Sequence, residues 1–368
     1  MSEKKKIKYE ETSLKKIKEI GLKLLKKIEK GEGIYLEIPI RRLSNVVFDK
    51  ENKKLILGEK VAKRYFLNVA HSKRFMQTLL VLSFCKTLLE EDERVSLREM
   101  FYSLKRTLPN SKENTFDEQR ESDAALVDVE LILDVIRERL NIGADPKGNV
   151  VGDIVIKDSL FGHEINLSKL GLGGWAIPSN VEHIEFKKVN ADKVIVIEKN
   201  AAWERLNAHM FWKKWNAILI GTKGQAARGA RRFIQRLNQE LGLPVYVLTD
   251  ADPYGWYIYS VIKYGSINLA HVSDRLGTPE AKFIGVSMTD IERYKLQNWT
   301  IKAKEFDLKR AKELMNYEWF KHPKWQKEIK KFLKTKRKAE IEALASKGLK
   351  FLSEKYLPQK LKEEDFLP

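Results

Sequence analysis

The stretch Val245-Tyr246-Val247-Leu248-Thr249-Asp250-Ala251-Asp252-Pro253-Tyr254-Gly255 decides how this chain is interpreted. Its first residues have high β-propensity and predict a strand. Residues i and i+2 of an extended chain face the same side, so Asp250 and Asp252 can point at one bound ion or phosphate. Pro253 and Gly255 then allow a sharp entry into a helix. Alone, the motif is weak, because surface turns are rich in Asp for local reasons.

Two earlier apolar runs give this motif a structural context. Residues 194–197 and 217–220 read as buried strands, with helices expected up to about residue 215 and over about 225–241. Apolar strands that alternate with helices predict a parallel sheet covered on both faces, and ligands bind at the carboxyl ends of such strands. Glu198, Asp250 and Asp252 all follow strand ends. We therefore expect a three-carboxylate cluster, whose hard oxygen ligands suit Mg²⁺.

Basic residues follow the middle strand. The loop Gly221-Thr222-Lys223-Gly224-Gln225 lacks the spacing of a nucleotide-phosphate loop, so we expect no nucleotide hydrolysis by this chain itself. Lys223, Arg228, Arg231 and Arg232 suit the backbone phosphates of a nucleic acid, and a solvated helix face is the alternative. The Gly-rich residues 171–175 form no dinucleotide-binding pattern and predict a loop.

A second candidate site lies in the first half of the chain. Ser96 and Glu99 form a capping-box pattern, which predicts a helix that starts at residue 97. Its expected buried stripe is Leu97, Phe101, Leu104 and Leu108, and a different face carries Arg98, Tyr102 and Lys105, with Arg106 beside them. A cation near a phenol favours the phenolate and can hold a phosphate next to it. The alternative is an ordinary amphipathic tyrosine.

The order of elements around this helix predicts a winged helix. Helices are expected over about 73–90, from 97, and over about 122–140, and a strand over 150–156 follows a turn at 145–148. Helices followed by a hairpin are typical of this DNA-docking module, although many winged helices bind only proteins. We expect four regions: a basic arm with small strands (1–70), the winged helix (71–157), a connection (158–190), and an α/β metal-binding domain with C-terminal helices (191–368).

Composition narrows the class of protein. The chain has 368 residues, 43% of them hydrophobic, and a net charge of +18 from 69 basic and 51 acidic residues, which favours a polyanionic partner. We expect neither a membrane span nor a secretory signal. The single cysteine, Cys85, excludes an intramolecular disulfide framework and indicates a reducing, cytoplasmic compartment. Residues 1–30 predict an amphipathic helix, either docked on its own domain or docking another subunit or DNA.

Four motifs, in order, carry a family resemblance. They are Leu97-Arg98-Glu99-Met100-Phe101-Tyr102, Gln119-Arg120-Glu121-Ser122-Asp123, Val196-Ile197-Glu198-Lys199-Asn200-Ala201 and Thr249-Asp250-Ala251-Asp252-Pro253-Tyr254-Gly255. Over roughly residues 34–360 the chain resembles the A subunits of archaeal DNA topoisomerase VI and, more distantly, the meiotic double-strand-break transesterase. Phe101 stands where meiotic relatives usually show a second tyrosine, and Thr222 where they usually show glycine, which favours the archaeal branch.

The resemblance implies a fold and a set of roles. It implies a catabolite-activator-like winged helix that carries the nucleophile, and a Toprim domain, a Rossmann-like parallel-sheet fold, that holds Mg²⁺. Tyr102 looks like the nucleophile and Arg98 its cationic helper, while Glu198, Asp250 and Asp252 look like the metal cluster.

The resemblance also implies an activity and partners. The activity is transient double-strand cleavage through a 5′-phosphotyrosyl intermediate in an ATP-dependent type IIB topoisomerase, which relaxes and decatenates DNA in the nucleoid. The implied assembly is a homodimer joined by a GHKL-type ATPase B subunit in an A₂B₂ heterotetramer. The alternatives are a Toprim-type Mg²⁺-dependent nuclease or primase without a covalent intermediate, and a non-catalytic winged-helix DNA-binding protein.

Overall fold

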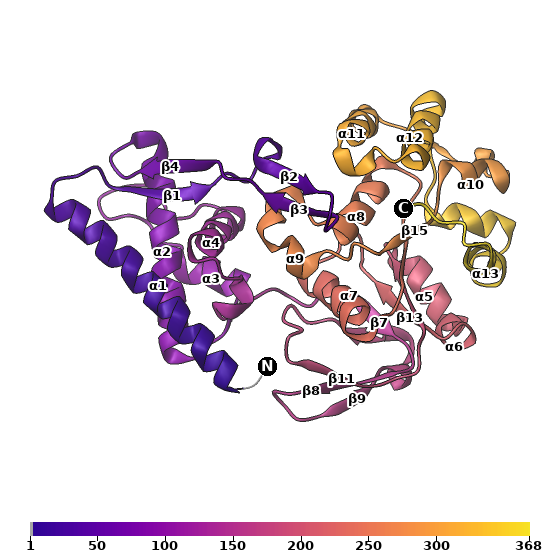
Figure 1. Ribbon diagram of the computed structural model, residues 1–368, viewed down its shortest axis with the longest axis horizontal. Coiled ribbons are helices and arrows are strands. Elements are labelled where there is room, and N and C mark those ends of the chain that lie inside the picture. The colour runs from indigo at the N-terminus through magenta and orange to yellow at the C-terminus, as the bar shows by residue number, and fades with distance from the viewer. Residues whose placement is uncertain (1–2) are drawn as a thin grey trace. The chain divides into compact units, whose positions relative to one another are not determined.

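The chain divides into two compact units. The structure is a computed structural model that describes the backbone of residues 3–368 and the side chains of residues 11–368. One unit comprises Met1–Val47 and Leu57–Asp145, and the other comprises Phe48–Ile56 and Pro146–Pro368 (Figure 1). No helix within the described residues is both long enough and apolar enough to span a membrane.

Helices dominate the N-terminal unit. They are α1 (Glu3–Glu29), α2 (Val69–Glu91), α3 (Leu97–Leu104) and α4 (Gln119–Leu133). Two small sheets accompany them, β1 (Tyr35–Pro39) antiparallel to β4 (Val61–Tyr65), and β5 (Val95–Ser96) parallel to β6 (Ile142–Gly143). Cys85 of α2 is fully buried in the apolar core with Met100 and Phe101 of α3. Burial raises the pKa of the Cys85 thiol to about 12, so this cysteine is an inert core residue.

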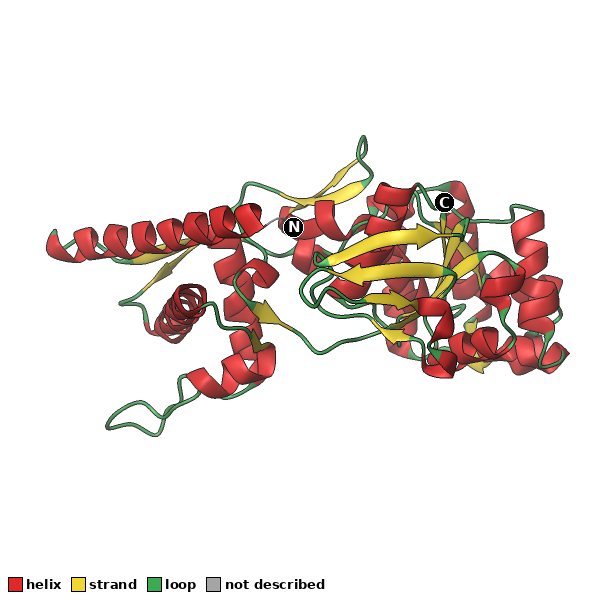
Figure 2. Ribbon diagram, turned by 90° about the horizontal axis from the view of Figure 1, so that it is seen from below, coloured by secondary structure: helices red, strands yellow, loops and turns green. Residues whose placement is uncertain are grey.

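The long arm helix α1 is only partly docked. Figure 2 shows it as one uninterrupted helix. Ile17 is buried against the core of the unit and Leu14 packs beside it. Leu25 and Ile28, which the periodicity places on the same stripe, are about half exposed. Leu24, by contrast, packs against the cluster of Leu36, Ile38 and Phe75, so α1 is docked along one side while Leu25 and Ile28 face outward.

Two helices of this unit end earlier than expected. α3 begins at Leu97 with both hydrogen bonds of the predicted capping box, but it ends at Leu104, so Lys105 and Leu108 lie beyond it. α4 ends at Leu133 because Asp134 adopts the left-handed conformation, with φ of 51°. In both cases apolar residues continue at helical spacing beyond the last helical residue. Periodicity alone therefore does not show where the helix ends.

The C-terminal unit is built on a six-stranded mixed sheet in the order β10-β7-β13-β12-β14-β15. Its four parallel strands are β12 (Lys193–Ile197), β13 (Ala217–Gly221), β14 (Val245–Leu248) and β15 (Lys282–Gly285). The intervening helices are α5 (Asn200–Ala208), α6 (Phe211–Lys214), α7 (Arg228–Leu241), α8 (Pro253–Tyr264) and α9 (Ser273–Leu276). The predicted parallel sheet is present, and nearly every residue of its central strands is buried because helices cover both faces.

The strand expected over residues 150–156 is two strands, and both belong to the C-terminal unit. β7 (Asn149–Val151) pairs with β13, while β8 (Ile154–Asp158) pairs with β9 (Glu164–Asn166) and β11 (Ile184–Val189), beside each other in Figure 1. β10 (Trp175–Ala176) closes the edge of the larger sheet. The boundary between units therefore falls at residue 145 and not at 157, and residues 158–190 are a folded sheet and not a mere connection. The expected hairpin of a winged helix is absent from the described residues of α4's own unit.

The remaining elements complete the C-terminal unit. The hairpin β2 (Val46–Asp49) and β3 (Lys54–Leu57) contributes Phe48, whose ring lies 5.4 Å from that of Tyr264. α10 (Met288–Arg293) comes next, followed by β16 (Ile301–Lys302), which pairs antiparallel with β17 (Arg337–Lys338). Between these two strands in the sequence lie α11 (Glu305–Asn316) and α12 (Pro323–Thr335). The last helix is α13 (Leu357–Lys362). Trp325 of α12 packs on Phe283 and Tyr259, so the inner face of α12 is part of the core of this unit.

Candidate active site

The carboxylates meet where two neighbouring strands end. β12 and β14 are parallel neighbours in register at Ile197 and Leu248, so the residues that follow them lie side by side. Glu198 accepts a hydrogen bond at Oε2 from the backbone N–H of Asp250, at 3.2 Å. β12 pairs with β13 on one side and β14 on the other, so the chain leaves its strands in opposite directions here. Such a switch point is where open α/β sheets bind ligands.

Burial and mutual repulsion shape the charge of this cluster. Burial, with the nearby charge of Asp250, raises the pKa of Glu198 to about 7. Burial also raises the pKa of Asp250 to about 6, partly opposed by the Ile341 N–H and the Lys199 ammonium. The pKa of Asp252 is raised by burial as well. A cation placed between these carboxylates would stabilise their ionised form.

Two lysines supply cationic charge to the cluster. Lys199 Nζ lies 3.1 Å from Asp250 Oδ2. Lys338 Nζ lies 3.6 Å from Asp252 Oδ2 and 3.1 Å from Oδ2 of Asp307, a carboxylate with no exposed surface. Asp252 also caps α8, accepting a hydrogen bond from the Gly255 N–H at 2.7 Å.

A C-terminal segment, residues 338–341, contacts each residue of the Asp-x-Asp motif through hydrogen bonds or an ion pair. The Ala251 N–H donates to the Ala339 carbonyl at 2.8 Å, and the Ile341 N–H donates to Asp250 Oδ1 at 2.9 Å. Glu340 Oε1 lies 3.7 Å from Lys199 Nζ. The sequence patterns did not reveal this segment, which falls within the expected C-terminal helices. No local signal marks it, because its partners lie some 90 residues earlier.

The donor chemistry of the cluster fits a hard divalent cation. Glu198, Asp250 and Asp252 offer only oxygen ligands, and burial raises the pKa of each carboxyl. Among the described residues, no group of three or more acidic, histidine or cysteine side chains is arranged so that it could hold a metal ion. Glu198 and Asp250 are thus joined directly, whereas Asp250 and Asp252 are each paired with a lysine.

Tyr102 is presented on the surface of α3. Its side chain is 60% exposed, whereas its neighbour Phe101 is buried. The Arg98 guanidinium lies 5.9 Å from the Tyr102 ring centroid, as the one-turn spacing predicts. Lys105 turns away, with Nζ 5.2 Å from the Phe101 ring and donating to the Asp117 carbonyl. Arg98 is therefore the cation beside Tyr102, and Lys105 and Arg106 lie past the end of the helix.

The basic residues after β13 mostly serve the fold. Arg228 and Arg231 are only 8% and 3% exposed. Arg232 forms an ion pair with Glu182, with Nε 2.6 Å from Oε1. Lys223 alone of the four is exposed, in a left-handed turn with φ of 54°. Burial leaves Arg228 and Arg231 little surface to offer a phosphate backbone, because α7 is covered on the side where they lie.

Comparison with known proteins decides the family. Three family models match in order: the type IIB DNA topoisomerase model over residues 73–142, the all-beta domain of the DNA topoisomerase VI alpha subunit over 147–190, and the Toprim domain of the topoisomerase 6 A subunit and Spo11 over 193–361. The type 2 DNA topoisomerase 6 A subunit of Pyrococcus abyssi is 47% identical over 365 residues, covering 96% of this chain and 95% of that protein. This chain belongs to the topoisomerase VI A-subunit family.

Other members of the topoisomerase VI A-subunit family agree along the whole chain. The Hyperthermus butylicus protein is 48% identical (94% of this chain, 93% of that protein), and the Methanocaldococcus jannaschii protein 40% (96% and 95%). The family resemblance and the type IIB topoisomerase class are thus confirmed, and so is a Toprim domain over the parallel sheet. The all-β match over 147–190 agrees with the sheet formed by β8, β9 and β11.

Proposed function

We propose that this chain is the DNA-cleaving subunit of an ATP-dependent type IIB topoisomerase and breaks both strands of a duplex transiently. The observation that carries the proposal is that Glu198 and Asp250 meet at the switch point of the sheet matched by the Toprim family model, with Asp252 two residues further on. An exposed tyrosine beside an arginine on α3, in the segment matched by the type IIB family model, supports it.

Tyr102 is the nucleophile in this proposal. Its phenolic oxygen attacks a backbone phosphorus and forms a phosphotyrosyl bond to the 5′ side of the break, while the 3′ oxygen leaves and takes a proton as a hydroxyl. An unperturbed tyrosine has a pKa of about 10, so the attack needs a cation or a base nearby. Arg98 supplies the cation, and its guanidinium can also hold the phosphate oxygens. The covalent bond preserves the energy of the phosphodiester, so the reverse attack by the 3′ hydroxyl reseals the strand.

Glu198, Asp250 and Asp252 are the residues that would hold Mg²⁺. When bound, the ion supplies positive charge that stabilises the transferring phosphate. The chain's own contribution is orientation: the Ile341 N–H and the Gly255 N–H fix one oxygen each of Asp250 and Asp252. Lys199 and Lys338 partly oppose the burial that raises the pKa of Asp250 and Asp252.

The proposed assembly has two copies of this chain, so that two tyrosines cut two strands. We propose an A₂B₂ complex with a GHKL-type ATPase B subunit that drives passage of another duplex, and a winged-helix role for α2–α4 in holding DNA. The exposed Leu25 and Ile28 of α1 suit an apolar contact with the B subunit. If Leu25→Ser and Ile28→Ser left co-purification with B unchanged, this docking role would be wrong.

Covalent adduct formation tests the proposal directly. The full chain is incubated with its B subunit, Mg²⁺, an ATP analogue and labelled duplex, and protein-linked DNA is resolved on a denaturing gel. We expect Tyr102→Phe to abolish adducts and the matched Tyr65→Phe, also on the N-terminal unit, to keep them. Asp250→Ala should lose adducts at limiting Mg²⁺. Strand scission without adducts would indicate a Toprim-type nuclease, and binding without scission a non-catalytic DNA-binding protein.

A further inference from the structure

The outer face of α12 carries a ridge of lysines that no part of the proposed reaction uses. The ridge consists of Lys324, Lys327, Lys330, Lys331 and Lys334, which recur at three- and four-residue intervals on one side of the helix. All are exposed except the half-buried Lys331, which pairs with Glu292. Four of the five line one shallow hollow. The single acidic residue of α12, Glu328, is 3% exposed, so α12 itself adds no exposed negative charge to this face.

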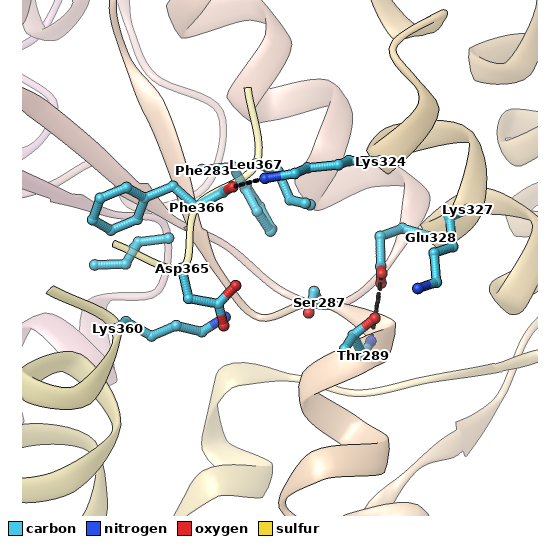
Figure 3. A pocket seen from close by; sticks show the side chains of 11 residues that line it. Phe283, Ser287, Thr289, Lys324, Lys327, Glu328, Lys360, Asp365, Phe366 and Leu367 are labelled. Atoms are coloured by element: carbon cyan, nitrogen blue, oxygen red, sulfur yellow. Dashed lines mark hydrogen bonds and ion pairs between the residues drawn. The ribbon is translucent and has the colours of Figure 1, made fainter. Parts of the chain in front are cut away.

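The ridge stands on a rigid support. The inner face of α12 contributes Trp325 and Phe332, which contact Trp256 of α8 edge to face at 6.1 and 5.8 Å. In Figure 3, Glu328 is joined to Thr289 of α10, and Lys324 reaches the Phe366 carbonyl at 3.5 Å. Because the backbone of α12 is already held in place, binding to a rigid polyanion need order only the lysine side chains.

The C-terminal end of the ridge leads to the carboxylate cluster. α12 ends at Thr335, and Lys338, three residues later, contacts Asp252. A helix of 13 residues is about 20 Å long at 1.5 Å per residue. A duplex rises 3.4 Å per base pair, so the helix matches a duplex arm of about six base pairs. DNA held at the carboxylates would have its neighbouring phosphates within reach of a cationic surface of this length.

We propose that α12 binds the arm of duplex DNA that flanks the cleavage site, through its backbone phosphates. The inference rests on the proposed function, because it takes the carboxylate cluster as the place where DNA is cut. Contacts from lysines to backbone phosphates carry no sequence information, so the interaction adds affinity and orientation and no sequence preference.

The salt dependence of DNA binding measures this contact. The variant Lys327→Gln/Lys330→Gln/Lys334→Gln is compared with Lys188→Gln/Lys213→Gln/Lys214→Gln, which removes the same charge from exposed positions elsewhere in the C-terminal unit. Binding of the full chain to a labelled duplex of about 40 base pairs is followed by anisotropy from low to moderate salt. Each lost phosphate contact lowers the slope of log K against log salt by about 0.9, so we expect a fall of up to about 2.7 for the α12 variant.

Each outcome bears on the proposal. A larger fall in slope for the α12 variant than for its control supports it, as does loss of backbone protection within about six base pairs of the cleavage position. Equal slopes for the two variants overturn it. An unchanged slope together with lost co-purification of the B subunit overturns it too and assigns the ridge to a protein partner. Adducts formed through Tyr102 at saturating DNA show whether the proposed function stands independently of this result.

Discussion

The ion pairs of Glu182 provide a quantitative test of whether the arginines of α7 serve the fold. Glu182 precedes β11, and its Oε1 lies 2.6 Å from Arg232 Nε and 2.7 Å from Arg275 of α9. Its second oxygen accepts from Arg232 Nη2 at 3.2 Å, so the Arg232 contact is bidentate. The perturbation is Glu182→Gln, which keeps the shape of the side chain and removes its charge.

The magnitude follows from the pKa of the carboxyl. Burial acts against ionisation, yet Arg232 and Arg275 outweigh it and lower the pKa of Glu182 from 4.5 to about 2. At about 1.4 kcal/mol per pKa unit, this lowering corresponds to roughly 3.5 kcal/mol. The side chain keeps about a quarter of its surface exposed, so screening reduces the expected loss to about 2 kcal/mol.

The sign of the pH dependence is fixed by the same shift. A carboxyl whose folded-state pKa is depressed contributes stability that is present above its unfolded pKa, here 4.5, and is lost as pH falls towards 2. We therefore expect the gap in stability between the parent chain and Glu182→Gln to be full at neutral pH. The gap should shrink progressively between about pH 5 and pH 2.

Denaturant unfolding at neutral and acid pH, followed by a probe in the C-terminal unit, checks this prediction. Glu164→Gln on β9 is the control, because this exposed glutamate has the same chemistry and no ion pair among the described residues. A Glu182→Gln chain as stable as the control at neutral pH would refute the reasoning. If Arg232→Gln instead left stability intact and lowered the salt slope of DNA binding, Arg232 would be a DNA contact after all.

Three further predictions concern the two candidate sites. Lys338→Met should destabilise the chain by about 3 kcal/mol in denaturant unfolding, because it leaves the buried Asp307 without its cation, and Lys338→Arg should restore most of this. Gly255→Ala should lower stability by about 2 kcal/mol and reduce adduct formation, because its Cβ would lie 2.5 Å from the Asp250 carbonyl oxygen; unchanged adducts would contradict this. Ser96→Ala should cost about 1 kcal/mol by removing the cap of α3, measurable as a lower midpoint of the N-terminal unit, with Ser103→Ala as control.

Local patterns in the sequence were enough to predict the elements that carry the site. The capping box at Ser96 set the first residue of α3, because both of its hydrogen bonds span only three residues. The apolar run before Asp250 predicted a buried strand, and strand-end logic joined Asp250 to Glu198. The family motifs lie on these same elements, which is why resemblance and periodicity agreed. The strand β15 was not foreseen, since residues 282–285 offer only a short apolar run.

Tertiary structure decided what surrounds those residues. The sequence by itself determined that two carboxylates follow a buried strand and that a tyrosine sits one turn after an arginine. Only the fold showed that residues 338–341 hold the Asp-x-Asp motif, that Arg231 is buried, and that β7 joins the C-terminal sheet. The physical reason is separation along the chain. Caps and strand periodicity arise from neighbours within a few residues, whereas the Ile341 N–H meets Asp250 across 91 residues because α11 and α12 pack on the core between them.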